Sequence, residues 1–271
     1  MRHWTLDDIP WQRFDPALVD PDLAAVAKAA SLVEHNSADY ADYLCNVFPD
    51  DPGFQAAARD WAVEEVQHGE ALGRWGELAD PGFSFAESMA RFRAGYRIPV
   101  DAIESVRGSR SGELTARCVV ETGTSSFYSA LRDASREPVL KVICAKIAGD
   151  EFRHYKLFYT HMQRYLAQEK PSRLRRILVA VGRYREADDD ELAFAYHCAN
   201  TADAAYDRKT AAAAYAGRAY RCYRPDHVRR AVTMILKATG VSTRGRLGDF
   251  ATKLAWRHLQ RQARAPLAAQ S

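Results

Sequence analysis

Two short segments pair a glutamate with a histidine three residues later, Glu65-Val66-Gln67-His68 and Glu151-Phe152-Arg153-His154. An α-helix advances 3.6 residues per turn, so side chains three residues apart point the same way and can hold one metal ion between them. A single Glu-x-x-His segment often arises by chance in a helix. The repeat, with one further glutamate on each of two other predicted helices, Glu34 and Glu121, is the pattern of a dinuclear carboxylate site in a four-helix bundle.

These side chains point to metal chemistry. Carboxylates placed together in an apolar core repel one another and lose their hydration, so cations must accompany them. Carboxylate and imidazole ligands suit iron or manganese, whereas a set without thiolates argues against structural zinc. We expect two iron ions, with manganese as the alternative occupant. Glu65 and Glu151 are available as bridges, and the other two glutamates would be terminal or shared ligands. The predicted metal ligands are Glu34, Glu65, His68, Glu121, Glu151 and His154.

Four predicted helices must bring these residues together. Apolar residues recur at steps of three and four along four stretches, each of which carries part of the set on its apolar face. The stretches are residues 22–48, 53–78, 113–135 and 138–168. Glu65 follows Glu34 by 31 residues, and Glu151 follows Glu121 by 30. Each half of the set is therefore expected to form an antiparallel helical hairpin. Glu64 is expected to point away from the shared face.

The rest of the chain also favours helix. Residues 1 to about 20 are expected to form an extended arm, with Trp4, Trp11 and Phe14 available to pack on the bundle. Further helices are predicted over residues 85–96, 172–184, 225–239 and 247–264, with one long helix after the acidic run at 188–191. We therefore expect an all-α protein, a four-helix bundle with additional C-terminal helices. Residues 1–170 would form the bundle with its arm, and residues 171–271 a helical extension packed on it.

Composition sets limits on the function. The chain has 271 residues, of which 47% are hydrophobic and 27% charged, as in ordinary soluble proteins. A net charge of +3 and the lack of a recognition motif argue against nucleic acid as a partner. The five cysteines form no close Cys-x-x-Cys pair. The sequence shows neither a signal peptide nor a run of about 20 apolar residues for a membrane span, so we expect a cytoplasmic protein.

The two motif segments resemble those of a known family. Residues 61–69, Trp-Ala-Val-Glu-Glu-Val-Gln-His-Gly, resemble the AEENRHG segment of soluble acyl-carrier-protein desaturases, and residues 148–154, Ala-Gly-Asp-Glu-Phe-Arg-His, resemble their AADEKRH segment. These desaturases belong to the ferritin-like di-iron superfamily, so the resemblance implies a ferritin-like four-helix bundle with additional C-terminal helices. The resemblance covers residues 32–168 and includes comparable intervals between the four helices. It implies the six ligands given above, a carboxylate at Asp150 that orients an imidazole across the site, and Thr124 on the oxygen side.

The resemblance also implies an activity. Soluble acyl-carrier-protein desaturases bind O₂ at a reduced di-iron centre and abstract hydrogens from an unactivated acyl chain. We therefore expect an oxidoreductase that oxidises an aliphatic or acyl substrate, with O₂ and an external electron donor such as ferredoxin. The chain is shorter than typical family members, and its C-terminal third matches no segment of theirs. We therefore expect this chain to share the metal site of the desaturases, but the resemblance does not predict its substrate.

Other functions fit the same ligand set. Related di-iron bundles carry out N-oxygenation or oxidative carbon–carbon cleavage of small metabolites, and ferroxidases or iron-binding proteins need no organic substrate. A metal-free relic that acts as an interaction module is a further alternative. A long narrow tube beside the metals would favour an acyl chain, and a compact polar pocket would favour a small amine or acid. A ferroxidase would have no deep apolar channel there.

Arginines are frequent in the C-terminal third, and we call the following set the basic rim: Arg173, Arg175, Arg176, Arg183, Arg218, Arg221, Arg224, Arg229 and Arg230. Such a surface can receive an acidic carrier protein, CoA or a carboxylate substrate. Charged, solvated helix faces explain the same residues equally well. The sequence also leaves a homodimer open.

Overall fold

The computed structural model describes residues 3–186, 190–243 and 245–264, and all regular structure in these ranges is helical. The prediction of an all-α protein is confirmed. Three short 3₁₀ turns come first, η1 (Leu6–Asp8), η2 (Trp11–Arg13) and η3 (Pro16–Leu18). The α-helices are α1 (Pro21–His35), α2 (Ser37–Val47), α3 (Pro52–Ala79), α4 (Phe85–Gly95), α5 (Arg110–Ala134), α6 (Pro138–Glu169), α7 (Arg173–Arg185), α8 (Asp190–Asn200), α9 (Arg208–Arg221), α10 (Pro225–Thr239) and α11 (Arg246–Ala263).

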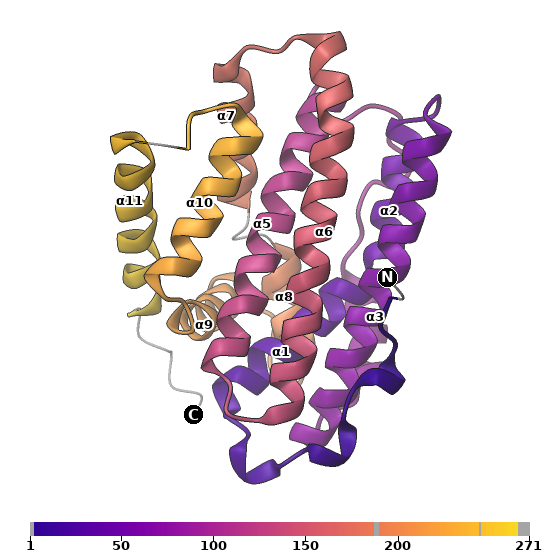
Figure 1. Ribbon diagram of the computed structural model, residues 1–271. Coiled ribbons are helices and arrows are strands. Elements are labelled where there is room, and N and C mark those ends of the chain that lie inside the picture. The colour runs from indigo at the N-terminus through magenta and orange to yellow at the C-terminus, as the bar shows by residue number, and fades with distance from the viewer. Residues whose placement is uncertain (1–2, 187–189, 244, 265–271) are drawn as a thin grey trace.

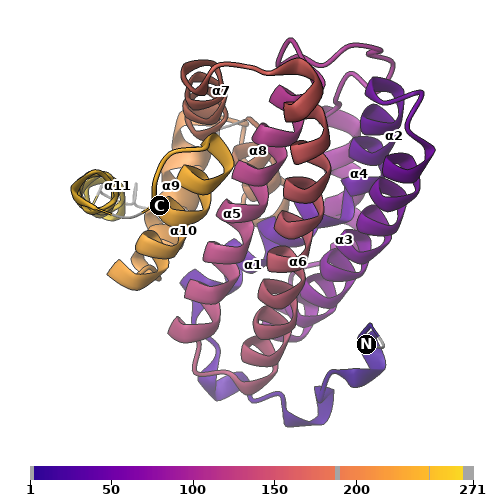
Figure 2. The ribbon, with the colours of Figure 1, turned by 45° about the horizontal axis from the view of Figure 1, so that its top comes forward.

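The long helices α3, α5 and α6 run side by side, with α1 against α3 (Figures 1 and 2). The most extensive contact is between α5 and α6, and α3 in turn packs on α6. Burial of their apolar faces is the main favourable contribution to this packing. The core between these helices includes Leu72, Trp75, Tyr128, Leu131, Ile143 and Ile147. The faces that carry the predicted ligands therefore point inward.

Side-chain caps fix where the four ligand-bearing helices begin. Asp20, Asp51, Ser109 and Glu137 precede α1, α3, α5 and α6, and each side chain accepts hydrogen bonds from backbone N–H groups of the first turn. Three of these caps are followed by proline at the first helical position, where its missing N–H costs nothing. The caps set the rotational register of the ligands on each helix.

The predicted helix over residues 22–48 is two helices. The α-helical hydrogen bonding stops at Asn36, which is buried and whose N–H bonds to the Val33 carbonyl in a tighter turn. The Ser37 hydroxyl donates to the Glu34 carbonyl at 2.5 Å, so a side chain takes over a backbone acceptor at the break. The break ends α1 one residue after Glu34 and lets α2 pack separately on α3.

The prediction of one long helix after residues 188–191 is also wrong. Residues 187–189 lie outside the described part, and the chain beyond them forms α8 and α9, separated by residues 201–207. Asn200 donates to the Ala25 carbonyl of α1 at 3.0 Å, and Asp207 caps the start of α9. The two helices pack on each other and on α1, while α10 packs on α5. The C-terminal helices therefore touch the two helices that carry Glu34 and Glu121.

The N-terminal arm packs on the ligand-bearing helices. Trp4 and Ile9 are buried in the same core as α3, α5 and α6, and Trp11 and Phe14 pack partly buried against it. The indole N–H of Trp11 donates to the Leu6 carbonyl at 2.9 Å, which folds the arm back on itself. The arm is thus a series of short turns rather than one extended strand.

A glycine allows α1 and α3 to approach closely beside the predicted ligands. A Cβ atom added at Gly69 would lie 2.6 Å from the His35 Cβ atom and 2.7 Å from the Ser31 carbonyl oxygen. Gly69 follows His68 directly, and His35 follows Glu34. The distance between these two ligands therefore depends on the missing side chain.

We predict that Gly69→Ala lowers the free energy of unfolding by about 1–3 kcal/mol, because the added methyl group forces the two helices apart. The matched control is Gly149→Ala. Gly149 is an exposed helical glycine with nothing within 4 Å of an added Cβ, and its replacement should raise stability by up to about 1 kcal/mol. Urea denaturation measures both. Equal effects of the two substitutions would contradict the close approach.

Candidate metal centre

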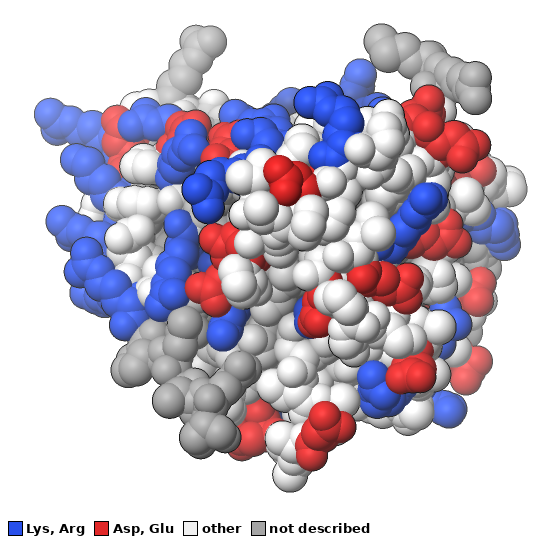
Figure 3. Space-filling view, turned by 90° about the horizontal axis from the view of Figure 1, so that it is seen from below, with Lys and Arg blue, Asp and Glu red and all other residues white. Residues whose placement is uncertain are grey.

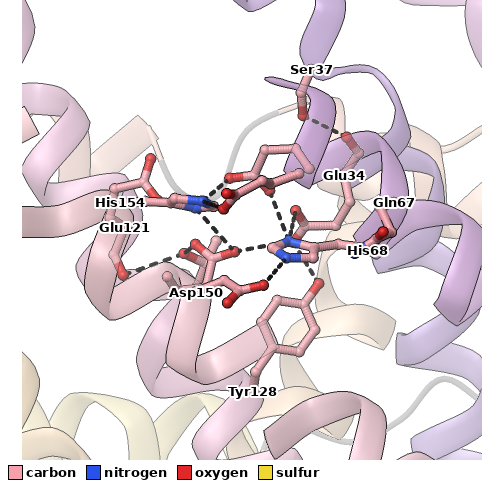
Figure 4. Close-up of polar contacts among 12 residues, drawn as sticks. Glu34, Ser37, Gln67, His68, Glu121, Tyr128, Asp150 and His154 are labelled. Atoms are coloured by element: carbon pink, nitrogen blue, oxygen red, sulfur yellow. Dashed lines mark hydrogen bonds and ion pairs between the residues drawn. The ribbon is translucent and has the colours of Figure 1, made fainter. Parts of the chain in front are cut away.

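The six predicted ligands meet in the interior (Figure 4). They form two overlapping groups within which one ligand atom per residue lies within 4.8 Å of all the others. Both groups contain Glu65 from α3 and Glu151 from α6. The first group is Glu34, Glu65, His68 and Glu151, and the second is Glu65, Glu121, Glu151 and His154. Two adjacent sites with two shared carboxylates are the geometry of a dinuclear centre.

All six residues are removed from solvent. Glu34 is the most exposed at 7%, and His68 is fully buried at 0%. Burying several carboxylates together is very unfavourable unless cations neutralise them. Their shared burial distinguishes these residues from an ordinary polar helix face, and bound cations would account for it.

The shared carboxylates lie between the two imidazoles. The Nδ1 atom of His68 is 3.3 Å from Glu65 Oε2 and 3.3 Å from Glu151 Oε1. The Nδ1 atom of His154 is 3.0 Å from Glu65 Oε1 and 4.0 Å from Glu151 Oε1. Each histidine therefore turns the same nitrogen toward both glutamates. This arrangement allows Glu65 and Glu151 to bridge two ions while each histidine holds one.

Several ligand atoms in the second group have no hydrogen-bond partner among the described residues. They are Glu121 Oε1 and Oε2, Glu151 Oε1 and His154 Nδ1, all fully buried. A buried polar atom without a partner costs about 1–3 kcal/mol. The atoms point to the same interior space as the ligands of the first group (Figure 4). Hard oxygen and imidazole donors of this kind fit divalent iron or manganese, and such ions would satisfy the partnerless atoms.

A second layer of carboxylates orients the histidines. His68 Nε2 lies 3.0 Å from Asp150 Oδ2, and His154 Nε2 lies 2.8 Å from Glu64 Oε2. The expectation that Glu64 points away is therefore wrong. Arg153 donates to both acids, at 2.6 Å to Asp150 and 3.0 Å to Glu64. Each acid directly precedes the glutamate of one motif and contacts the histidine of the other motif. The repeated acid-Glu-x-x-His pattern in the sequence could therefore have predicted the role of Glu64.

The N-terminal arm completes this second layer. The indole N–H of Trp4 donates to Asp150 Oδ2 at 2.6 Å. Its ring stacks on the His68 imidazole with a centroid distance of 5.9 Å and an angle of 5° between the planes. Gln67 donates to the Trp4 carbonyl at 3.0 Å. The arm therefore covers His68 and fixes Asp150, a role that the sequence did not indicate.

The buried charges shift several pKa values. Burial, and then the charge of Glu65, raises the pKa of Glu34 well above its usual value, and burial does the same for the pKa of Glu121. Burial alone would lower the pKa of His68 and His154, but the surrounding carboxylates outweigh it and raise both pKa values. Each of these groups therefore holds its proton more tightly than a free side chain does, and a bound cation would compete with that proton.

Two hydroxyl groups of α5 hold ligand carboxylates. The Thr124 hydroxyl donates to Glu151 Oε2, and Tyr128 donates to Glu34 Oε1 at 2.5 Å. Thr124 and Tyr128 follow Glu121 by three and seven residues, so all three lie on one face of α5. Both hydroxyls orient oxygens of the centre on its α5 side. Thr124 was predicted to lie near the site, whereas a role for Tyr128 was not.

A cavity of about 300 Å³ adjoins the centre on this side. Glu34, Glu65, Glu121, Thr124 and Glu151 contribute to its wall. Helices α9, α10 and α11 supply much of the remaining wall, with Tyr215, Ala219, Val228, Val232, Ile235 and Leu259. The C-terminal third, for which the sequence showed no family resemblance, therefore supplies part of the wall of a mainly apolar cavity beside the candidate metal centre.

We compared the sequence with protein-family models and with curated protein sequences. No family model matches the chain, and no curated protein sequence matches it significantly. The likeness to acyl-carrier-protein desaturases thus rests on the motif segments and their spacing. Within the described ranges, every helix is too short or too polar to cross a lipid bilayer.

We predict that Asp150→Asn weakens metal affinity by about 10–100-fold while all six ligands remain, because outer carboxylates orient histidine ligands and raise their basicity. Competition with a chelator for Mn(II) measures the affinity. The control is Asp60→Asn, an exposed acid on the outer face of α3, which should leave affinity unchanged. An Asp150→Asn affinity within twofold of the wild type would rule out the orienting role.

We also predict that metal binding releases protons. Glu34, Glu121 and both histidines have raised pKa values in the metal-free protein. A bound metal ion displaces the protons that these groups hold, so affinity should rise as the pH rises. Anaerobic titration with Fe(II) in two buffers of different protonation enthalpy gives the proton count by calorimetry. An enthalpy that is the same in both buffers would contradict this electrostatic description.

Proposed function

We propose that the protein is a ferritin-like, non-haem di-iron oxidoreductase that uses O₂ to oxidise an aliphatic substrate by hydrogen abstraction. The observation that carries the proposal is the mainly apolar cavity whose wall includes four of the six buried ligands. A metal centre that opens onto an enclosed apolar space can act on a C–H bond held there. The resemblance of the two motif segments to acyl-carrier-protein desaturases agrees with this activity.

The protein residues have distinct parts in the proposed reaction. Two iron ions, when bound, would supply O₂ activation and hydrogen abstraction. Glu65 and Glu151 would hold both ions, and the Thr124 hydroxyl fixes the orientation of the Glu151 carboxylate on the cavity side. The apolar wall would exclude water and position the substrate chain. In a desaturation, O₂ takes two hydrogens from the substrate and two electrons and two protons from outside to give two waters, so an external donor such as ferredoxin is required.

The cavity argues against a ferroxidase or an iron carrier. Those functions need a path for iron but no enclosed apolar space, whereas here helices α9, α10 and α11 build a wall that faces the centre. A metal-free interaction module would have no reason to retain buried carboxylate oxygens without hydrogen-bond partners. The cavity is thus the feature that favours an organic substrate.

The size of the cavity favours a small substrate. A volume of about 300 Å³ lies at the lower end of the range of ligand pockets, roughly 300–1,000 Å³. This volume is small for a long acyl chain. The second candidate is therefore a di-iron oxygenase or oxidase of a small metabolite, acting by N-oxygenation or carbon–carbon cleavage.

Much of the basic rim is engaged within the chain. Arg218 pairs with Asp22 at 2.9 Å, and Arg176 donates to the Ala238 carbonyl at 2.9 Å. Seen from below, Lys and Arg still gather on the side where α11 lies in Figure 1 (Figure 3). The internal contacts nevertheless weaken the case for a docking surface. We favour a free substrate over one delivered by an acidic carrier protein.

Metal content and O₂ uptake test the proposed function. Protein loaded anaerobically with Fe(II) should bind two ions per chain, and aliphatic compounds that fit the cavity should stimulate O₂ uptake and appear as oxidised products. Glu65→Ala should abolish both, and Glu70→Ala, an exposed glutamate on the same helix, should change neither. Iron oxidation that no organic compound affects would favour a ferroxidase, and protein that binds no metal would refute the proposal.

A further inference from the structure

A buried arginine lines the cavity beside the candidate metal centre. Arg117 lies on α5 one turn before Glu121, is only 8% exposed, and contributes to the cavity wall. It donates no hydrogen bond to any described residue, and its Nε atom is buried without a partner. A guanidinium carries five N–H donors, so Arg117 has a large unused capacity to bind an anion.

The neighbours of Arg117 do not satisfy it. The nearest carboxylate oxygen is Glu113 Oε1, 3.8 Å from the Arg117 Nε atom, too far for a hydrogen bond. The other oxygen of Glu113 accepts from the Tyr43 hydroxyl at 2.9 Å and the Ser105 hydroxyl at 2.8 Å. Glu113 therefore already has partners of its own, and it gives Arg117 only a loose ion pair.

Aromatic rings hold the guanidinium in place. Its central carbon lies over the Tyr40 ring, 4.8 Å from the centroid, and over the Trp61 ring at 5.9 Å. Contacts of this kind use the face of the cation and leave the in-plane N–H donors available. Tyr40 and Trp61 also line the cavity. The cation is thus held at the cavity wall with its buried Nε–H group unpaired.

We propose that Arg117 binds the carboxylate of the substrate, so that the cavity accepts small aliphatic carboxylates. A carboxylate matches the forked geometry of guanidinium with two parallel hydrogen bonds. It would also supply partners for buried donors that are otherwise costly. The proposal names the substrate class of the di-iron oxidoreductase and in that sense rests on the proposed function, although carboxylate binding itself requires no turnover.

The position of Arg117 restricts which carbon reacts. Arg117 precedes Glu121 by four residues, a distance of about 6 Å along the axis of α5. Helical side chains lean toward the N-terminus, and the contact with Glu113 shows that Arg117 does so, away from the metal ligands. The carboxylate would therefore bind away from the centre, and the chain would extend along α5 toward Glu121 and Thr124. The carbon presented to the metals lies several bonds from the carboxylate.

Binding of octanoate and octanamide to the full-length, metal-loaded protein tests the proposal. Both probes have ten non-hydrogen atoms, and only octanoate is charged. Calorimetry should show that octanoate binds at least tenfold more tightly than octanamide. Arg117→Met should reduce this preference to less than threefold, and Arg117→Lys should keep part of it. Arg59→Met, a change at an exposed arginine of α3, should preserve the preference in full.

Several results would overturn the proposal. Equal affinities for octanoate and octanamide in the wild type would do so without any variant, even if Arg117→Met fails to fold. A preference that persists in folded Arg117→Met, or that disappears only when the metal is removed, would place the carboxylate on the metals instead. The outcome is separable from the proposed function. Octanoate preference without O₂ chemistry would refute only the oxidase role, and O₂ chemistry without octanoate preference would refute only the carboxylate anchor.

Discussion

The mutual repulsion of four buried glutamates is the constraint on which the rest of the structure depends. Glu34, Glu65, Glu121 and Glu151 come from four helices and meet within a few ångströms. Their four negative charges balance the four positive charges of two divalent ions, with both histidines neutral. Without such ions, the group must take up protons or lose stability. The fold therefore brings together four carboxylates whose charge two divalent ions would balance.

The surrounding elements each restrict the position or the orientation of residues in this centre. The absent side chain of Gly69 lets α1 approach α3, and Asp150 and Glu64 fix the imidazoles. Trp4 covers His68 from the N-terminal arm, while the C-terminal helices enclose the cavity on the α5 side. The N-terminal arm and the C-terminal helices thus both pack around the same interior site. Pre-organisation of this kind is what a reactive metal centre requires.

The sequence predicted the local part of this arrangement and missed the part that arises from packing. Spacing of three residues on a helix placed Glu65 with His68, and apolar periodicity placed their helix face inward. The break at Asn36 was missed because the apolar periodicity continues across it, while the backbone forms a tighter turn there. Glu64 was missed because its partner, His154, lies on another helix. The cavity wall and the position of Arg117 depend on how α5 meets helices far along the chain, which periodicity cannot show.

X-ray absorption spectroscopy of the iron-loaded protein tests the central claim most directly. Two carboxylate-bridged ions should give a shell of oxygen and nitrogen neighbours and, in addition, an iron neighbour at roughly 3.5–4 Å, the separation usual for two-metal sites. A spectrum with no iron neighbour, or with sulfur in the first shell, would contradict a dinuclear carboxylate centre at these six residues.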